Sequence, residues 1–209
     1  MDLSLPLHGV APTLDAEVLT VLSGTTAPLT GRRVSQLAAR GSRPGIQRVL
    51  NRLVAEGLVL AQDAGASVLY QLNRDHLLAS AVLEVVAARD ELIRRLQEAV
   101  DQWARPCVNA SLFGSVARGG DADQHSDVDL LVVRPAAVAG DDEIWQRQLR
   151  DLEDAVLRWT GNSLSWFETT EDDLRRAVAA EEPVVDSWRT ESIHLSGVRL
   201  SQLLRSMAA

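Results

Sequence analysis

The chain of 209 residues has a single cysteine, Cys107, and no apolar run near the roughly 18 residues that a membrane-spanning helix requires. A lone cysteine excludes a disulfide within one chain and a zinc site built from cysteines. Its place beside an apolar strand favours a small buried side chain. The N-terminus also lacks a basic region followed by a continuous apolar stretch, which is the pattern of a secretory signal. We therefore expect a protein without membrane spans that works in the cytoplasm.

Lysine is absent as well, so all 21 basic residues are arginine, and they are unevenly distributed. Residues 1–75 carry seven Arg and six acidic residues, a net charge of +1, whereas residues 76–209 carry fourteen Arg and twenty-three acidic residues, a net charge of −9. The overall charge of −8 therefore combines two halves that suit different partners. The length fits two compact domains.

The first 75 residues show the order of elements of a winged helix. Apolar residues at helical spacing, with caps before them and glycines after them, predict three helices. These lie over residues 14–22, between Thr30 and Gly41, and between Ser42 and Gly57. Two apolar runs, 58–61 and 68–72, then predict a β-hairpin whose turn covers 62–67. Helices followed by a hairpin are typical of a winged helix-turn-helix domain, which we assign to residues 1–75.

Six arginines between residues 32 and 52 have no acidic residue among them, a pattern that attracts phosphates. If the apolar residues of the third predicted helix face the core, its polar residues face outward, where they can reach bases or phosphates. These candidate DNA-binding residues are Arg43, Gln47, Arg48, Asn51 and Arg52. We therefore expect binding to double-stranded DNA. The alternative is an arginine-rich face that packs against another surface.

Residues 73–103 are predicted to form one long helix, because apolar residues recur on one broad side and Arg105-Pro106 ends the pattern. We assign residues 76–105 as a linker helix that leads to a second domain, residues 106–209. The apolar stripe fits either pairing with a second copy of the chain in a homodimer or covering of the C-terminal domain.

A predicted strand over 108–113 leads into a sharp turn, 114–120, that opens a short helix. Glycine at such a turn lets a phosphate approach closely, and the amide and hydroxyl of Ser115 can bind phosphate oxygens. Arg118 adds a positive charge. We expect Gly114, Ser115 and Arg118 to bind the phosphates of a nucleoside triphosphate.

After a polar loop, residues 127–133 predict a buried strand whose two-residue period places Asp127 and Asp129 on one face. Two carboxylates there repel each other and lose hydration, which is costly unless a cation lies between them. Mg²⁺ suits a few carboxylates together with substrate phosphates, and Mn²⁺ is the alternative ion. The pattern predicts a phosphoryl-transfer site in which Asp127 and Asp129 are metal ligands and catalytic residues.

The run LFGSVARG over 112–119, followed by SDVDL over 126–130, resembles the minimal nucleotidyltransferase family of the DNA polymerase beta superfamily. The resemblance covers roughly residues 107–200. The whole chain is similar to bacterial regulator-like proteins that fuse such a domain to a winged helix. The resemblance implies an α/β (α+β) two-domain fold whose C-terminal domain has a mixed sheet with flanking helices. It also implies transfer of a nucleoside monophosphate from a triphosphate, with ATP expected, to a hydroxyl.

In that family a third acid commonly lies on the next strand, where it binds metal or activates the acceptor hydroxyl. Here a helix is predicted over 145–159 and the following strand over 163–168. By position Ser165 stands where the third acid is expected, and serine is a poor metal ligand. Glu168 is the nearest substitute, yet it lies three residues further along and has the opposite strand parity.

Three functions remain open at this point. The first is a Mg²⁺-dependent nucleotidyltransferase tied to DNA, whose acceptor is a protein side chain, a small molecule or an RNA end. The second is a transcriptional regulator whose degenerate nucleotidyltransferase domain senses nucleotide without catalysis, which Ser165 favours. The third is an antitoxin-like protein that acts on a partner protein.

Overall fold

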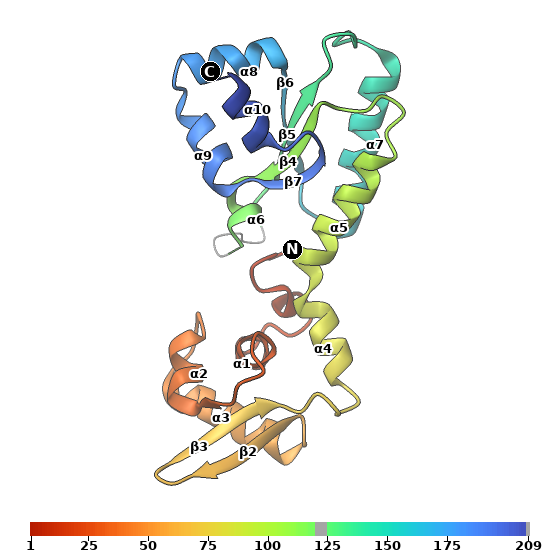
Figure 1. The fold of residues 1–209 in the computed structure, drawn as a ribbon. Coiled ribbons are helices and arrows are strands. Elements are labelled where there is room, and N and C mark those ends of the chain that lie inside the picture. The colour runs from red at the N-terminus through yellow and green to blue at the C-terminus, as the bar shows by residue number, and fades with distance from the viewer. Residues whose placement is uncertain (120–124, 208–209) are drawn as a thin grey trace. The chain divides into compact units, whose positions relative to one another are not determined.

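The structure is a computed structural model that describes residues 1–119 and 125–207. These residues form two compact units, and most of their helices and strands are labelled in Figure 1. One unit spans Leu5–Ala88, and the other, the mixed-sheet unit, combines Met1–Ser4 with the residues from Arg89 onward. None of the helices in the described ranges has the length and hydrophobicity that a membrane crossing requires.

The unit Leu5–Ala88 consists of helices packed on a small antiparallel sheet. Its elements are η1 (Pro6–Gly9), α1 (Leu14–Ser23), β1 (Leu29–Thr30), α2 (Gly31–Leu37), α3 (Arg43–Ala55), β2 (Val59–Ala64), β3 (Ser67–Leu72) and α4 (Ala79–Val86). The strand order is β1-β3-β2, and both pairings are antiparallel. The three predicted helices and the hairpin are therefore present in the predicted order.

The helices of this unit begin at the caps that the sequence predicts. Thr30 Oγ1 accepts a hydrogen bond from the N–H of Arg33 at 3.2 Å, and Ser42 Oγ accepts one from the N–H of Gly45 at 3.3 Å. Both contacts satisfy backbone donors that a helix start leaves unpaired. The apolar faces of α1, α2 and α3 then meet the sheet in one core.

The predicted end of the second helix is wrong. α2 ends at Leu37, with Ala38 in an extended conformation, so the helix stops short of Gly41. The buried carboxylate of Glu17, on α1, accepts a hydrogen bond from the N–H of Ala39 at 3.0 Å. This contact gives the backbone a partner outside the helix, which favours an early end.

The predicted hairpin turn is also too long. The paired residues run from Val59 opposite Leu72 to Ala64 opposite Ser67, which leaves a two-residue turn at 65–66. Gly65 has a φ of +67°, a conformation that glycine adopts without a steric penalty. The exposed end of β2 is polar or small, so hydrophobicity does not mark it as a strand.

The single long helix predicted over 73–103 is wrong as well. α4 ends at Val86, Ala87 forms a turn, and α5 (Ala88–Asp101) follows. The apolar stripe continues through the break, so the sequence pattern does not reveal it. The valines of α4 pack against the core of the unit Leu5–Ala88, whereas the leucines of α5 lie in the core of the mixed-sheet unit. The stripe is divided because its two halves are buried in different cores.

The mixed-sheet unit has a four-stranded sheet of order β6-β5-β4-β7. After α5 its elements are β4 (Asn109–Phe113), α6 (Gly114–Arg118), β5 (Val128–Arg134), α7 (Glu143–Thr160), β6 (Leu164–Thr170), α8 (Glu171–Ala179), α9 (Pro183–Glu191), β7 (Ile193–Gly197) and α10 (Leu200–Met207). β5 and β6 are parallel, and the other pairings are antiparallel. The mixed sheet with flanking helices agrees with the fold expected from the sequence.

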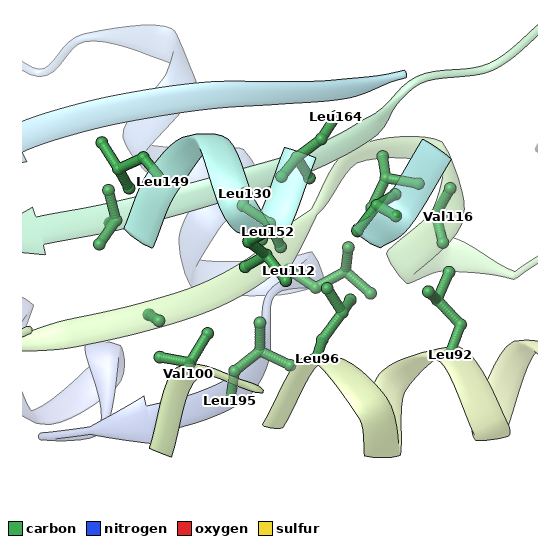
Figure 2. Packing of buried hydrophobic residues seen from close by; sticks show 14 of the residues in the cluster. Leu92, Leu96, Val100, Leu112, Val116, Leu130, Leu149, Leu152, Leu164 and Leu195 are labelled. Atoms are coloured by element: carbon green, nitrogen blue, oxygen red, sulfur yellow. The ribbon is translucent and has the colours of Figure 1, made fainter. Parts of the chain in front are cut away.

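Helices cover both faces of this sheet (Figure 1). α5 and α7 lie on one face, where they pack around residues such as Leu112 and Leu130 (Figure 2). α8, α9 and α10 cover the other face, against Leu131 and Val133. Successive residues of β5 therefore point to opposite faces, so each polar residue's position along the strand decides which face it reaches.

The first residues of the chain belong to the mixed-sheet unit. Leu3 is 2% exposed and lies in the same core as α5 and α7. The backbone nitrogen of Met1 donates to Asn162 Oδ1 at 2.7 Å. The unit Leu5–Ala88 is therefore joined covalently to the mixed-sheet unit at both of its ends.

Replacing Leu3 by Ala should lower the free energy of unfolding of the mixed-sheet unit by about 3 kcal/mol, because it leaves a cavity in the core. All five tryptophans lie between residues 103 and 188, so their fluorescence in a urea titration reports the unfolding of this unit. Leu157→Ala, at an exposed position of α7, is the matched control and should cost less than about 0.5 kcal/mol. A Leu3→Ala variant as stable as the wild type would contradict the burial of this segment.

Candidate functional site

The predicted site begins where β4 ends and α6, a helix of five residues, begins. Gly114 has a φ of +74°, and a Cβ atom at this position would overlap the carboxylate of Asp129. Both facts require glycine, because any side chain would be strained and would displace the carboxylate. Ser115, the next residue, is half-buried. Gly114 thus lets the backbone of the turn lie directly against Asp129.

Asp129 lies near the start of β5, between Phe113 on β4 and Ser165 on β6. Burial raises the pKa of its carboxyl, the nearby charge of Asp127 raises this pKa further, and the charge of Arg118 lowers it. Asp127 is exposed and directly precedes β5. The structure therefore brings the two predicted acids within electrostatic reach of each other.

Arg118, a predicted phosphate-binding residue, lies at the end of α6 and donates to Glu191 Oε2 on α9 at 2.7 Å. Ser187 donates to the same carboxylate oxygen at 3.0 Å. Because Arg118 also lowers the pKa of Asp129, its charge acts on Asp129 as well as on Glu191. A phosphate at this site would compete with Glu191 for the guanidinium. The last residue of the predicted turn, Gly120, and residues 121–124 of the predicted polar loop lie outside the described residues.

Ser165, the residue expected at the third-acid position, lies directly beside Asp129 in the register of β5 and β6. Glu168, the suggested substitute for a third acid, pairs in register with Val132, whose side chain lies in the core beneath α5 and α7. Its Oε1 accepts hydrogen bonds from Arg134 Nε at 2.8 Å and from an indole N–H of α7 at 3.0 Å. Because side chains alternate along a strand, Glu168 is not brought to the acid pair.

Part of the chain that contains this site is similar to a known protein family. Residues 92–181 match the nucleotidyltransferase domain family. The matched range contains Gly114, Ser115, both aspartates and Ser165, and it ends before α9. The likeness to nucleotidyltransferases expected from the sequence is therefore confirmed for this part of the chain.

A search of the curated proteins found no match. Among solved structures, one described as "Crystal structure of the toxin-antitoxin with AMP-PNP" is 14% identical in sequence, with a TM-score of 0.37. The similarity covers 56% of this chain and 83% of that chain. Likeness at this level carries no argument about fold or function.

The acid pair, which lies within the matched range 92–181, has the chemistry to hold a divalent cation. Carboxylate oxygens are hard ligands, and the raised pKa of Asp129 shows that its negative charge is costly beside Asp127. Within residues 1–119 and 125–207, no group of three or more His, Cys, Asp and Glu is arranged to hold a metal. Two carboxylates fit Mg²⁺ or Mn²⁺, since substrate phosphates and water can complete the coordination.

Among the candidate DNA-binding residues of α3, Arg43 and Arg48 are exposed. In the part of the chain that the structure describes, neither has a carboxylate within ion-pairing distance. Arg52 is also exposed, but its guanidinium contacts Asp15 and lies 2.6 Å from Glu56 Oε1. The charge of Arg52 is therefore partly neutralised within the protein.

The two amide residues of α3 are tied to each other. The Nε2 atom of Gln47 donates to Asn51 Oδ1 at 2.9 Å and to the hydroxyl of Tyr70 at 2.8 Å. Gln47 is half-buried, whereas Asn51 is exposed. Of these two residues, Asn51 therefore presents the more accessible side chain.

Three residues that contact the candidate site were not identified from the sequence. Arg89 contacts the carbonyls of α6, Asn162 contacts the segment before Asp127, and Glu191 pairs with Arg118. Each comes from an element remote in sequence from the residue it contacts. A single polar residue does not change the hydrophobic period of an amphipathic segment, so the sequence does not distinguish a residue that contacts the site from one that faces solvent.

Asp129→Asn should raise the melting temperature of the metal-free protein at pH 7, because the amide removes a charge that folding disfavours. Because the pKa of Asp129 is higher in the folded state than in the unfolded state, its negative charge destabilises the fold at pH values above the folded-state pKa. This destabilisation is absent below the unfolded-state pKa. The gain should therefore shrink toward pH 4, near the usual aspartate pKa of about 4. Melting is followed by tryptophan fluorescence in EDTA. Asp154→Asn, at an exposed position of α7, is the control and should leave the melting temperature unchanged. An unchanged or lower melting temperature for Asp129→Asn would show that the charge of Asp129 does not destabilise the fold.

Proposed function

We propose that the chain is a Mg²⁺-dependent nucleotidyltransferase, with Mn²⁺ as an alternative ion. It transfers a nucleoside monophosphate from a triphosphate, ATP in the first instance, to a hydroxyl acceptor. The observation that carries the proposal is Asp129, a half-buried carboxylate that lies against Gly114 and is electrostatically coupled to Asp127. Its location in a range that matches the nucleotidyltransferase domain family supports this reading.

Each residue of the site has a role in this proposal. The backbone at Gly114 and the amide and hydroxyl of Ser115 bind the terminal phosphates, and Arg118 adds positive charge beside them. Asp127 and Asp129 hold the divalent cation, which when bound neutralises charge on the phosphates and on the attacking and leaving oxygens. The acceptor hydroxyl releases its proton to water, and its oxygen forms a bond to the α-phosphorus while the bond from that phosphorus to pyrophosphate breaks.

The test incubates the full chain with each α-labelled nucleoside triphosphate and Mg²⁺ or Mn²⁺, alone and with candidate protein, small-molecule and RNA acceptors. Asp129→Ala should lower any transfer by at least about a hundredfold while leaving the fold intact, because one of the two metal ligands is lost. Asp154→Ala, on the surface of α7, is the matched control and should retain transfer. Full transfer by Asp129→Ala would reject the mechanism.

Ser165 favours a second candidate function, a nucleotide sensor. Its place beside Asp129 puts a hydroxyl, rather than a carboxylate, where a metal ligand or base is needed. Nucleotide and metal binding would then persist without transfer, and nucleotide would change the affinity of the chain for DNA by about 5- to 150-fold. A sensor binds the triphosphate and Mg²⁺ but leaves the α-labelled nucleotide unchanged with every acceptor.

We further propose that residues 1–75 form a winged helix-turn-helix module that binds double-stranded DNA. The order of helices and hairpin supports this, as do the exposed Arg43 and Arg48 on α3. Arg52 has a weaker role in this proposal, because Asp15 and Glu56 already occupy its guanidinium.

Replacing both Arg43 and Arg48 by Ala should weaken binding to double-stranded DNA and lower the salt dependence of that binding. Each lost phosphate contact reduces the slope of log K against log salt by about 0.9. Arg52→Ala is the comparison variant and should have a smaller effect, since its charge is partly neutralised. Fluorescence anisotropy with a labelled duplex at several salt concentrations measures both quantities. A double variant that binds like the wild type at every salt concentration would remove α3 from the interface.

A further inference from the structure

The short helix α6 is held at its carboxyl end by Arg89, the second residue of α5. Arg89 Nε donates to the carbonyl oxygen of Val116 at 2.7 Å, and Nη2 donates to that of Ala117 at 2.6 Å. A helix of five residues leaves most of its carbonyls without partners, so this two-pronged contact satisfies acceptors that would otherwise need water. Gly119, with a φ of +76°, leaves room for the guanidinium, which would lie 3.2 Å from a Cβ atom there.

The segment that carries Asp127 is held from the turn between α7 and β6. Asn162 is 4% exposed, and its Nδ2 donates to the carbonyl oxygen of Ser126 at 2.8 Å. The N–H of Val128 donates to the carbonyl oxygen of Ser163 at 2.9 Å. Asp127 therefore lies between two residues whose backbones are anchored to the same turn. An exposed carboxylate at a strand start gains a defined position from this pair of contacts.

We propose that Arg89 and Asn162 are positioning residues of the nucleotidyl-transfer site, Arg89 for the phosphate-binding turn and Asn162 for the metal-binding Asp127. This inference rests on the proposed function. Neither residue touches substrate in the proposed mechanism, because Arg89 acts through α6 and Asn162 acts through Ser126.

The two supports should affect different properties of the site. Arg89 fixes the helix that begins with Gly114 and Ser115, so its loss displaces the groups that bind phosphates. Asn162 fixes the backbone next to Asp127, so its loss displaces one metal ligand and leaves the phosphate-binding turn in place. Displacements of about 1 Å in such sites change function strongly, whereas a general loss of stability would change both properties together.

The experiment uses the full chain and measures two equilibria. Calorimetry gives the affinity for the non-hydrolysable analogue AMP-PNP at saturating Mg²⁺, and electron paramagnetic resonance gives the Mn²⁺ concentration for half-saturation with AMP-PNP present. Arg89→Met, which keeps the length of the side chain and removes its donors, should weaken AMP-PNP binding by at least about tenfold. It should change Mn²⁺ half-saturation by less than about twofold. Arg89→Lys, which keeps the charge and a donor, should lie between this variant and the wild type.

Asn162→Ala should show the reverse pattern. The Mn²⁺ concentration for half-saturation should rise by at least about tenfold, and AMP-PNP affinity at saturating Mg²⁺ should change by less than about threefold. If this variant does not fold, Asn162→Ser, which keeps a donor of shorter reach, is measured instead, and a shift confined to Mn²⁺ is again expected.

Matched controls separate these effects from nonspecific ones. Arg94→Met removes an exposed arginine of α5 that pairs with carboxylates on the same helix. Asn73→Ala removes an amide that donates to the carbonyl oxygen of Gly57 at 2.8 Å in the unit Leu5–Ala88. Both controls should leave the two equilibria at wild-type values.

The outcomes distinguish this inference from the proposed function beneath it. A wild-type chain that binds no AMP-PNP would overturn both. A wild-type chain that binds AMP-PNP, with Arg89 and Asn162 variants that match it, would overturn the inference alone. Equal changes in both equilibria within each variant would also overturn it, since they would indicate a purely structural role.

Discussion

The close approach of the Asp129 carboxylate to the backbone at Gly114 is the contact on which the rest of the site depends. Only glycine permits it, because φ is positive there and a Cβ atom would overlap the carboxylate. The contact keeps Asp129 half-buried near Asp127, and burial and repulsion together raise its pKa. The metal-free protein therefore carries an electrostatic cost at this point, which the apolar cores on both faces of the sheet offset. Such a cost is expected where a site is built to receive a cation.

Both proposed supports of the site, Arg89 and Asn162, belong to the mixed-sheet unit. Arg89, which directly follows Ala88, holds α6, and Met1, in the segment before Leu5, contacts Asn162. Asn162 in turn holds Ser126, next to Asp127. The segments that precede and follow the unit Leu5–Ala88 in sequence therefore both make contacts within the mixed-sheet unit.

Much of the fold and of the candidate site follows from local sequence signals. Caps at Thr30 and Ser42 mark helix starts because their side chains satisfy local backbone donors. The resemblance singles out Ser165 on the strand after the second helix, and the register of the sheet then pairs it with Asp129. The prediction of one helix over 73–103 is wrong because its apolar stripe continues across Ala87. Periodicity alone cannot show that the two halves of a stripe belong to different cores.

The sequence by itself indicated most of the helices and strands, their order, the glycine turn and the acid pair. All of these depend on residues within a few positions of one another, where backbone geometry and hydrophobic period act directly. Only the tertiary structure decided which distant side chains hold the site. It brought Arg89 to α6, Asn162 to Ser126 and Glu191 to Arg118, and it directed Glu168 to Arg134 instead of the acid pair. The physical reason is that a hydrogen bond or ion pair forms only between groups that lie close together in space. The packing of helices on the sheet decides which distant groups come close, and no local pattern in the sequence records this.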